Sequence, residues 1–223
     1  MFDVGAKKFE SRDDAGELLA KKLDKFKENA VVVAIPRGGV VVGAAVAKRL
    51  KIPLDLIIIR KLGAPGNPEL AIGATTSKGG IVLDRDLIDK LDIPSKYVHQ
   101  EHVRQLSEAR RRQKLYLKED RTELIGKLVI LVDDGIATGS TIEAAVHAVR
   151  EELPDKIIIA APVAPIETAD RLKLIADEVV VLSTPEPFYA IGEFYSDFPQ
   201  VSDQEVVELL QEFYLGKRDK EVR

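Results

Sequence analysis

Cysteine is absent from the 223-residue sequence, which excludes disulfide bonds, thiolate chemistry and cysteine-ligated zinc or iron–sulfur centres. The sequence also lacks an apolar run long enough to cross a bilayer, which takes about 20 residues. Its opening residues, Met-Phe-Asp-Val, show neither the basic start nor the apolar stretch of a secretory signal. We therefore expect a cytoplasmic protein that has no membrane partner and depends on packing for its stability.

Positive charge is in slight deficit, with 33 lysine and arginine residues against 37 aspartate and glutamate residues and a net charge of −4. Because affinity for a nucleic-acid backbone depends on clustered cations, we expect no nucleic-acid partner. A dense basic run, residues 110–112 with Lys114, lies in a helical pattern that also contains Glu101, Glu108 and Glu119. We interpret this run as a solvated or subunit-contacting helix face.

Short apolar runs alternate with amphipathic segments along most of the chain. Buried strands are predicted at 31–35, 54–59, 128–132, 157–161 and 179–182. Helices are predicted at 11–26, 40–50, 85–92, 95–117, 140–153, 167–176 and 202–215. The alternation predicts a Rossmann-like α/β fold, with a parallel sheet covered by helices on both faces, and leaves the strand order open. At this length we expect a single domain over residues 1–223, with its core at about 31–182.

Residues 129–141, which read VILVDDGIATGST, carry the clearest chemistry in the sequence. Asp133 and Asp134 follow a buried strand, where adjacent carboxylates repel each other unless donors or positive charge face them. Ribose hydroxyls and a nearby Mg²⁺ would supply both. The small and hydroxyl-bearing residues that follow leave N–H groups free at a helix N-terminus, where an anion is favoured. This order predicts a receptor for ribose 5-phosphate, whereas simple helix capping is the alternative.

The segment resembles the motif with which type I phosphoribosyltransferases bind 5-phosphoribosyl-1-pyrophosphate (PRPP): an apolar run, two acids, then Thr-Gly and a hydroxyl residue. The resemblance implies that Asp133 and Asp134 hold the ribose hydroxyls and act on a metal indirectly, through substrate or water. The implied contacts of the 5-phosphate are Ala137, Thr138, Gly139, Ser140 and Thr141. The family's fold would add a small C-terminal hood at about 183–201, together with N-terminal and C-terminal helices.

A second segment, after the first predicted strand, resembles the pyrophosphate loop of that family. Arg37, Gly38 and Gly39 follow a proline there. In such a loop, backbone amides and a basic side chain meet the leaving group, and glycine permits unusual torsions and a close approach. A plain strand-to-helix turn would explain the glycines but not the arginine.

A third segment follows the second predicted strand. Arg60 and Lys61 resemble the basic residues at the root of the family's flexible catalytic loop, which would comprise residues 62–80. Glycines and prolines suit a lid that closes over the reaction and excludes water. Residues 77–80 read as the turn of a hairpin within it. Ordinary surface placement of both cations is the alternative.

The expected hood is rich in aromatic residues, since five of the twelve in the chain lie at 188–198. These rings can stack on a planar heterocycle or pack a small satellite core, and Phe188 is our candidate for stacking. In the family that the chain resembles, several oxopurine enzymes have an acid just before Thr-Gly, where this chain has Ala137. Hypoxanthine and guanine are therefore disfavoured. Glu69 could serve as an acid or base instead, although a solvated loop carboxylate is the simpler interpretation.

The resemblance implies transfer of the phosphoribosyl group from PRPP to a nitrogenous acceptor, which we expect to be a nucleobase, with release of pyrophosphate. Arg37, Lys61, Asp133 and Asp134 are the implied catalytic residues, Mg²⁺ the implied cofactor and a homodimer the implied assembly. A PRPP-binding regulator with little or no catalysis is the alternative function. PRPP synthesis is a third, which would require an ATP site and normally a longer chain.

Overall fold

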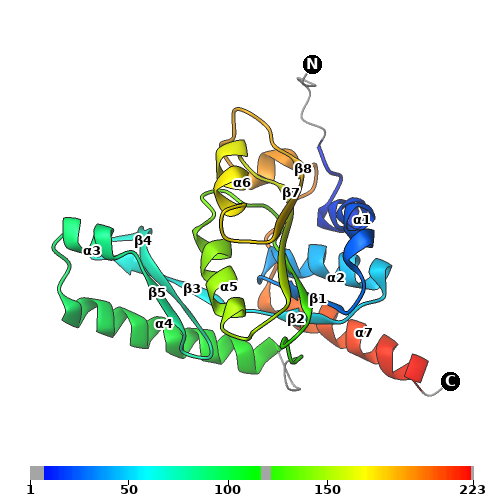
Figure 1. Cartoon of the computed structure of the whole chain (residues 1–223), viewed down its shortest axis with the longest axis horizontal. Coiled ribbons are helices and arrows are strands. Elements are labelled where there is room, and N and C mark those ends of the chain that lie inside the picture. The colour runs from blue at the N-terminus through cyan, green and yellow to red at the C-terminus, as the bar shows by residue number, and fades with distance from the viewer. Residues whose placement is uncertain (1–7, 117–121, 222–223) are drawn as a thin grey trace.

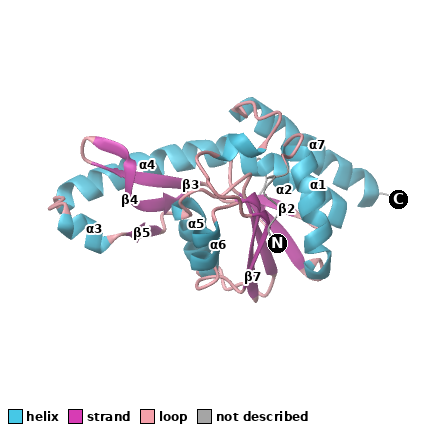
Figure 2. Ribbon diagram, turned by 90° about the horizontal axis from the view of Figure 1, so that it is seen from above, coloured by secondary structure: helices cyan, strands magenta, loops and turns pink. Residues whose placement is uncertain are grey.

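The computed structural model describes residues 8–116 and 122–221, apart from the side chains of Glu69, Glu212 and residues 215–221. The elements in chain order are α1 (Arg12–Leu23), η1 (Asp24–Phe26), β1 (Ala30–Ala34), α2 (Gly38–Leu50), β2 (Leu54–Leu56), β3 (Ile59–Ala64), β4 (Asn67–Thr76), β5 (Ile81–Leu83), α3 (Arg85–Lys90), α4 (Ser95–Tyr116), β6 (Leu128–Val132), α5 (Ser140–Arg150), β7 (Lys156–Val163), α6 (Ile166–Leu172), β8 (Glu178–Ser183), η2 (Ile191–Phe194) and α7 (Asp203–Glu221). A central sheet lies between helices, and an arm of β3, β4, β5, α3 and α4 extends from one side (Figures 1 and 2). Within the described residues, no helix combines the length and apolar character needed to span a bilayer.

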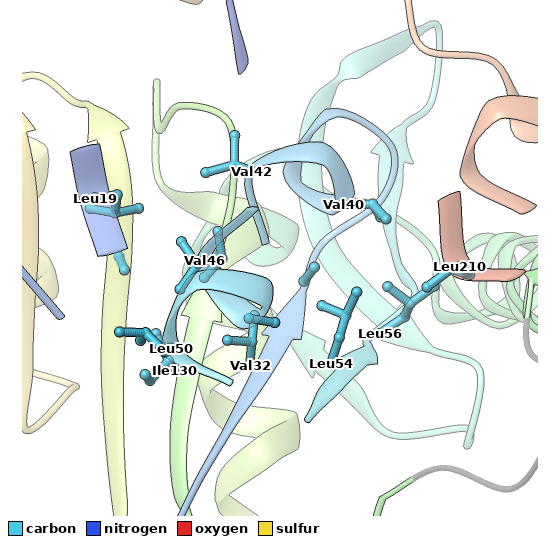
Figure 3. Packing of buried hydrophobic residues seen from close by; sticks show 14 of the residues in the cluster. Leu19, Val32, Val40, Val42, Val46, Leu50, Leu54, Leu56, Ile130 and Leu210 are labelled. Carbon is cyan, nitrogen blue, oxygen red and sulfur yellow. The ribbon is translucent and has the colours of Figure 1, made fainter. Parts of the chain in front are cut away.

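The central sheet has five parallel strands in the order β2-β1-β6-β7-β8, which confirms the predicted sheet. Successive residues of a strand face opposite sides, so the sheet separates two cores. Val32 and Ile130 pack with α1 and α2 (Figure 3), whereas Val31 and Leu131 pack with α5 and α6. Both faces are covered, which explains why the strands appear in the sequence as continuous apolar runs.

The strand order, which the sequence pattern left open, places β1 beside β6 in the sheet. Ala34 pairs with Val132, so both strands end at the same level. From β1 the chain goes on to β2 on one side, and from β6 it goes on to β7 on the other. Open α/β sheets bind ligands at such a switch point, outside the carboxyl ends of the strands.

The arm is a three-stranded antiparallel sheet packed on α3 and α4, with Leu62, Ile72 and Val98 in its own small core. The predicted hairpin turn at 77–80 is present between β4 and β5. Much of the segment expected as a flexible loop, residues 62–80, instead forms β3 and β4. Two of its glycines, Gly63 and Gly73, sit where strands approach closely, and at Gly63 a Cβ atom would lie 2.7 Å from Pro68 Cα.

Serine side chains cap the first and last helices, and the last helix has the full capping box that its sequence predicts. Ser11 Oγ accepts the Asp14 N–H at 3.2 Å, which ends the extended chain and starts α1. At α7, Ser202 Oγ accepts the Glu205 N–H at 3.1 Å, and Glu205 Oε2 accepts the Ser202 N–H at 2.6 Å. The first cap places Arg12 in the first turn of α1, where its side chain is buried.

Candidate functional site

The loops after β1 and β6 meet through two glycines and two carboxylates. A Cβ atom at Gly38 would overlap the carboxylate of Asp134, and one at Gly39 would lie 2.9 Å from Asp133 Oδ1. Neither glycine has a positive φ, so glycine is needed here for close approach and not for an unusual torsion. The predicted pyrophosphate loop and the predicted ribose-binding acids therefore lie side by side.

Asp134 is held by residues far from it in the sequence. Arg12 donates from Nε to Asp134 Oδ2 at 2.6 Å, and the two side chains are only 9% and 13% exposed. Tyr195 donates from its hydroxyl to the main-chain oxygen of Asp134 at 2.6 Å. The sequence predicts that ribose hydroxyls and Mg²⁺ face the acid pair. For Asp134, the protein itself supplies positive charge through the guanidinium of Arg12. No local pattern marked Arg12, which lies 122 residues before its partner.

Asp133 is held differently, because among the described residues no cation lies within ion-pair distance of its carboxylate. Its Oδ1 accepts the Asp134 N–H at 2.8 Å. Burial, and then the neighbouring Asp134 carboxylate, raise the pKa of Asp133 well above its usual range. A perturbed carboxyl group at the end of a central strand is a candidate for a functional role.

The turn between the acids and α5 is braced from α6. Thr168 Oγ1 donates to Ala137 O at 3.0 Å, and Arg171 donates from Nη2 to Thr138 O. Arg171 also donates from Nε to Glu143 Oε1 of α5 at 2.8 Å. The carbonyl groups of the turn are therefore occupied on the α6 side.

The N–H groups of the same turn are free. Within the described part of the chain, nothing accepts a hydrogen bond from the N–H groups of residues 137–139. The first N–H groups of α5 have no acceptor within the helix. Gly139 adopts φ 84° just before α5, and the Thr138 and Ser140 hydroxyls lie 3.2 Å apart. Free N–H groups and hydroxyls at a helix N-terminus are the features that an anion cradle requires, and the anion cradle at 137–141 stays a prediction.

Arg37 lies at the N-cap of α2, after a cis peptide bond to Pro36. Its Nη1 is 3.7 Å from Asp203 Oδ1, which is too long for a hydrogen bond, and its side chain is 30% exposed. Asp203 has a closer partner, the Tyr116 hydroxyl at 2.6 Å, and Arg111 Nη2 lies 3.7 Å from its other oxygen. Arg37 is therefore loosely paired at the edge of the site.

The family is decided by comparison with known sequences. The profile of the phosphoribosyl transferase domain matches residues 8–78 and 74–198 of this chain. The chain belongs to the phosphoribosyltransferase family. Candidate phosphoribosyl transferases of two Mycobacterium tuberculosis strains, CDC 1551/Oshkosh and ATCC 25618/H37Rv, are 43% identical to it over 206 residues.

These matches cover 92% of this chain but 46% of each relative, so the chain spans about half the length of the curated relatives. The crystal structure of TT1426 from Thermus thermophilus is similar to the chain with a TM-score of 0.82 and 42% sequence identity. That similarity covers 92% of this chain and 99% of TT1426.

Two other expected site residues lie on the arm. Arg60 Nε donates to Gln105 Oε1 of α4 at 3.0 Å, and burial followed by the nearby Arg112 lowers the pKa of Arg60. Lys61 is exposed on β3. Within the described residues, neither side chain bonds to the loops after β1 and β6. Arg112 itself is part of the basic run and pairs with Glu108 at 3.0 Å on the same helix.

The aromatic residues of the hood pack on one another. Phe188 lies 5.0 Å from Phe194 and Tyr195 lies 4.8 Å from Phe198, measured between ring centres, within one small core. Of the two uses proposed for this cluster, the packing of a satellite core is the one the structure displays. Phe188 remains half-buried, and the side chain of Glu69 lies outside the described residues.

Proposed function

We propose that this phosphoribosyltransferase transfers the 5-phosphoribosyl group of PRPP to a nitrogenous acceptor and releases pyrophosphate. The observation that carries the proposal is the continuity of the loop after β6, where Asp133 and Asp134 precede the free N–H groups of 137–139. The acids also touch Gly38 and Gly39 of the neighbouring loop. A diol, a phosphate and a pyrophosphate are the polar parts of PRPP, and this site offers a matching group for each.

Each part of the site has a proposed role. The carboxylates of Asp133 and Asp134 accept hydrogen bonds from the ribose hydroxyls, and residues 137–141 hold the 5-phosphate. Arg37 turns from its loose contact with Asp203 toward the pyrophosphate. As the bond from C1 to the leaving oxygen breaks, positive charge grows on the ribose beside the acids, and Arg37 neutralises charge on the leaving group. Lys61 joins Arg37 if the arm moves toward the loops.

Mg²⁺ fits this site as an ion bound mainly through the substrate. Within the described ranges, no three His, Asp or Glu side chains converge to hold a metal by themselves. The carboxylates of Asp133 and Asp134 provide hard oxygen atoms, which suit Mg²⁺ that keeps substrate and water ligands. Bound there, Mg²⁺ would neutralise charge on the pyrophosphate.

We propose a nucleobase as the acceptor, with the exposed part of Phe188 as its contact in the hood. Ala137 supplies no acid or base, so the acceptor nitrogen must attack without a carboxylate from that position. We further propose that residues 1–223 form one domain, which predicts a single calorimetric unfolding transition.

The test is calorimetric titration of the chain with PRPP, with and without Mg²⁺, followed by an assay of pyrophosphate release against purine and pyrimidine bases. Mg²⁺-dependent binding with base-specific release supports the transferase. Binding without release from any base supports the regulatory alternative, and absence of PRPP binding contradicts the assignment of residues 129–141.

A further inference from the structure

Arg12 joins four segments that are distant in the sequence. Its Nε bonds Asp134 Oδ2, and its Nη1 donates to Pro199 O at 2.8 Å. Its guanidinium carbon lies 3.7 Å from the centre of the Phe198 ring. A Cβ atom on Gly38 would lie 2.8 Å from its Nε, so the loop after β1 also closes on it.

We propose that Arg12 is a positioning residue of the ribose subsite, which holds Asp134 so that its second oxygen faces the ribose hydroxyls. The proposal rests on the proposed function. Arg12 engages Oδ2, and within the described residues no cation and no main-chain N–H donates to Asp134 Oδ1. The other protein group that interacts with the Asp134 side chain is the adjacent Asp133 carboxyl, so Oδ1 can accept from a ligand. Tyr195 fixes the main-chain oxygen of the same residue. Asp134 is therefore restrained both at its carboxylate and at its main chain before any ligand binds.

The charges of Asp133, Asp134 and Arg12 support the same positioning role for Arg12. Two adjacent ionised carboxylates at the end of a buried strand repel each other, and this repulsion would favour rotation of one of them away. Arg12 offsets the negative charge of Asp134 and makes no hydrogen bond to the Asp133 carboxylate. The acid pair can then exist in its binding arrangement in the free protein, so less ordering is needed when the sugar binds.

Only arginine suits the position. A lysine has one compact charged group, whereas the planar guanidinium bonds Asp134 and Pro199 O through different nitrogens while its face lies on Phe198. Because Pro199 and Phe198 belong to the hood, Arg12 also connects the hood to the ribose subsite. A change in the hood should therefore alter sugar binding.

The test compares two ligands of the proposed site, of which only one contains ribose. The dissociation constants of ribose 5-phosphate and of inorganic pyrophosphate are measured by calorimetry for wild type, Arg12→Met and Arg12→Lys. We expect Arg12→Met to weaken ribose 5-phosphate binding at least tenfold and pyrophosphate binding less than twofold. Arg12→Lys should lie between Arg12→Met and wild type. The matched control is Arg49→Met, which removes an exposed ion pair with Glu17 between α2 and α1 and should change neither constant.

The outcomes separate the two proposals. If wild type binds neither PRPP nor ribose 5-phosphate, the proposed function fails. If wild type binds and a folded Arg12→Met binds ribose 5-phosphate equally well, or loses both ligands equally, the role of Arg12 is overturned. Should Arg12→Met not fold, Phe198→Leu keeps the charge but removes the ring beneath it. That variant should weaken ribose 5-phosphate binding about threefold, and unchanged binding would overturn the inference.

Discussion

The two ends of the loop after β6 are held by different parts of the molecule. The acid end, which comprises Asp133 and Asp134, is braced by Arg12 of α1 and Tyr195 of the hood. Both residues lie outside the parallel sheet. The phosphate end, at residues 137–139, is braced by Thr168 and Arg171 of α6, the helix that follows β7. The proposed ribose subsite therefore depends on the N-terminal helix and the hood, whereas the phosphate cradle depends on the α/β core. Variants at the two ends should consequently differ in stability as well as in ligand binding.

Asp134→Ala should have the largest effect. It leaves the buried Arg12 without its partner, and breaking a buried ion pair from one side costs about 3–5 kcal/mol. Urea unfolding measures the loss, and calorimetry should show that PRPP binding is lost with it. Glu17→Ala is the control, because its pair with Arg49 is exposed and worth about 1 kcal/mol or less. Equal losses for the two variants would contradict the importance of the buried pair.

Gly38→Ala should have the next largest effect. The added methyl group would overlap the Asp134 carboxylate, and overpacking of this kind costs about 1–3 kcal/mol. We expect PRPP affinity to fall more than tenfold, because the acid must move away from the loop after β1. Gly80→Ala is the matched control, since its new atom would meet neighbours at an ordinary 3.4 Å. Normal PRPP affinity in Gly38→Ala would show that the acid end tolerates displacement.

Asp133→Asn should act in the opposite direction on stability. The raised pKa of Asp133 means that the folded protein keeps this proton at pH values where the unfolded chain has released it. The contribution of Asp133 to wild-type stability therefore falls as pH rises from the ordinary aspartate pKa of about 3.9 toward the raised value, and stays lower above it. The variant avoids this loss, so its Tm at neutral pH should exceed that of wild type while PRPP binding weakens. Melting curves from about pH 4 to pH 8 test this, and a lower Tm than wild type at neutral pH contradicts it.

The contrast between the contiguous loop after β6 and the distant residues that brace it explains which parts of the site the sequence could predict. The loop after β6 is contiguous, so its acids, its glycines and its hydroxyl residues are readable in order, and the covered parallel sheet follows from apolar runs such as 128–132. Arg12 could not be found in this way. Its role depends on the direction in which α1 crosses the sheet and on where Phe198 lies, and neither is encoded in spacing along the chain.

The arm shows a second limit of local patterns. Its glycines and prolines predicted a flexible loop over 62–80, with a hairpin about residues 77–80 as its regular part, because these residues usually interrupt strands. In the folded chain Gly63 instead permits close contact between paired strands, and Leu62 and Ile72 are fully buried in the core of the arm. Strand pairing and burial thus outweighed local propensity, which is more context-dependent for strands than for helices.

Arg171→Met should have the smallest effect and would sharpen the contrast at the phosphate end. Arg171 is half-exposed, so loss of its bonds to Thr138 O and Glu143 should reduce stability by only about 0.5–1 kcal/mol. The freed turn should bind inorganic phosphate several-fold more weakly, with little change in pyrophosphate binding at the loop after β1. Lys173→Met, which removes an exposed pair with Asp170 on the same side, is the control. If Arg171→Met weakened both ligands as much as Asp134→Ala does, the two ends of the loop would not be independent, and the phosphate cradle would also depend on the hood.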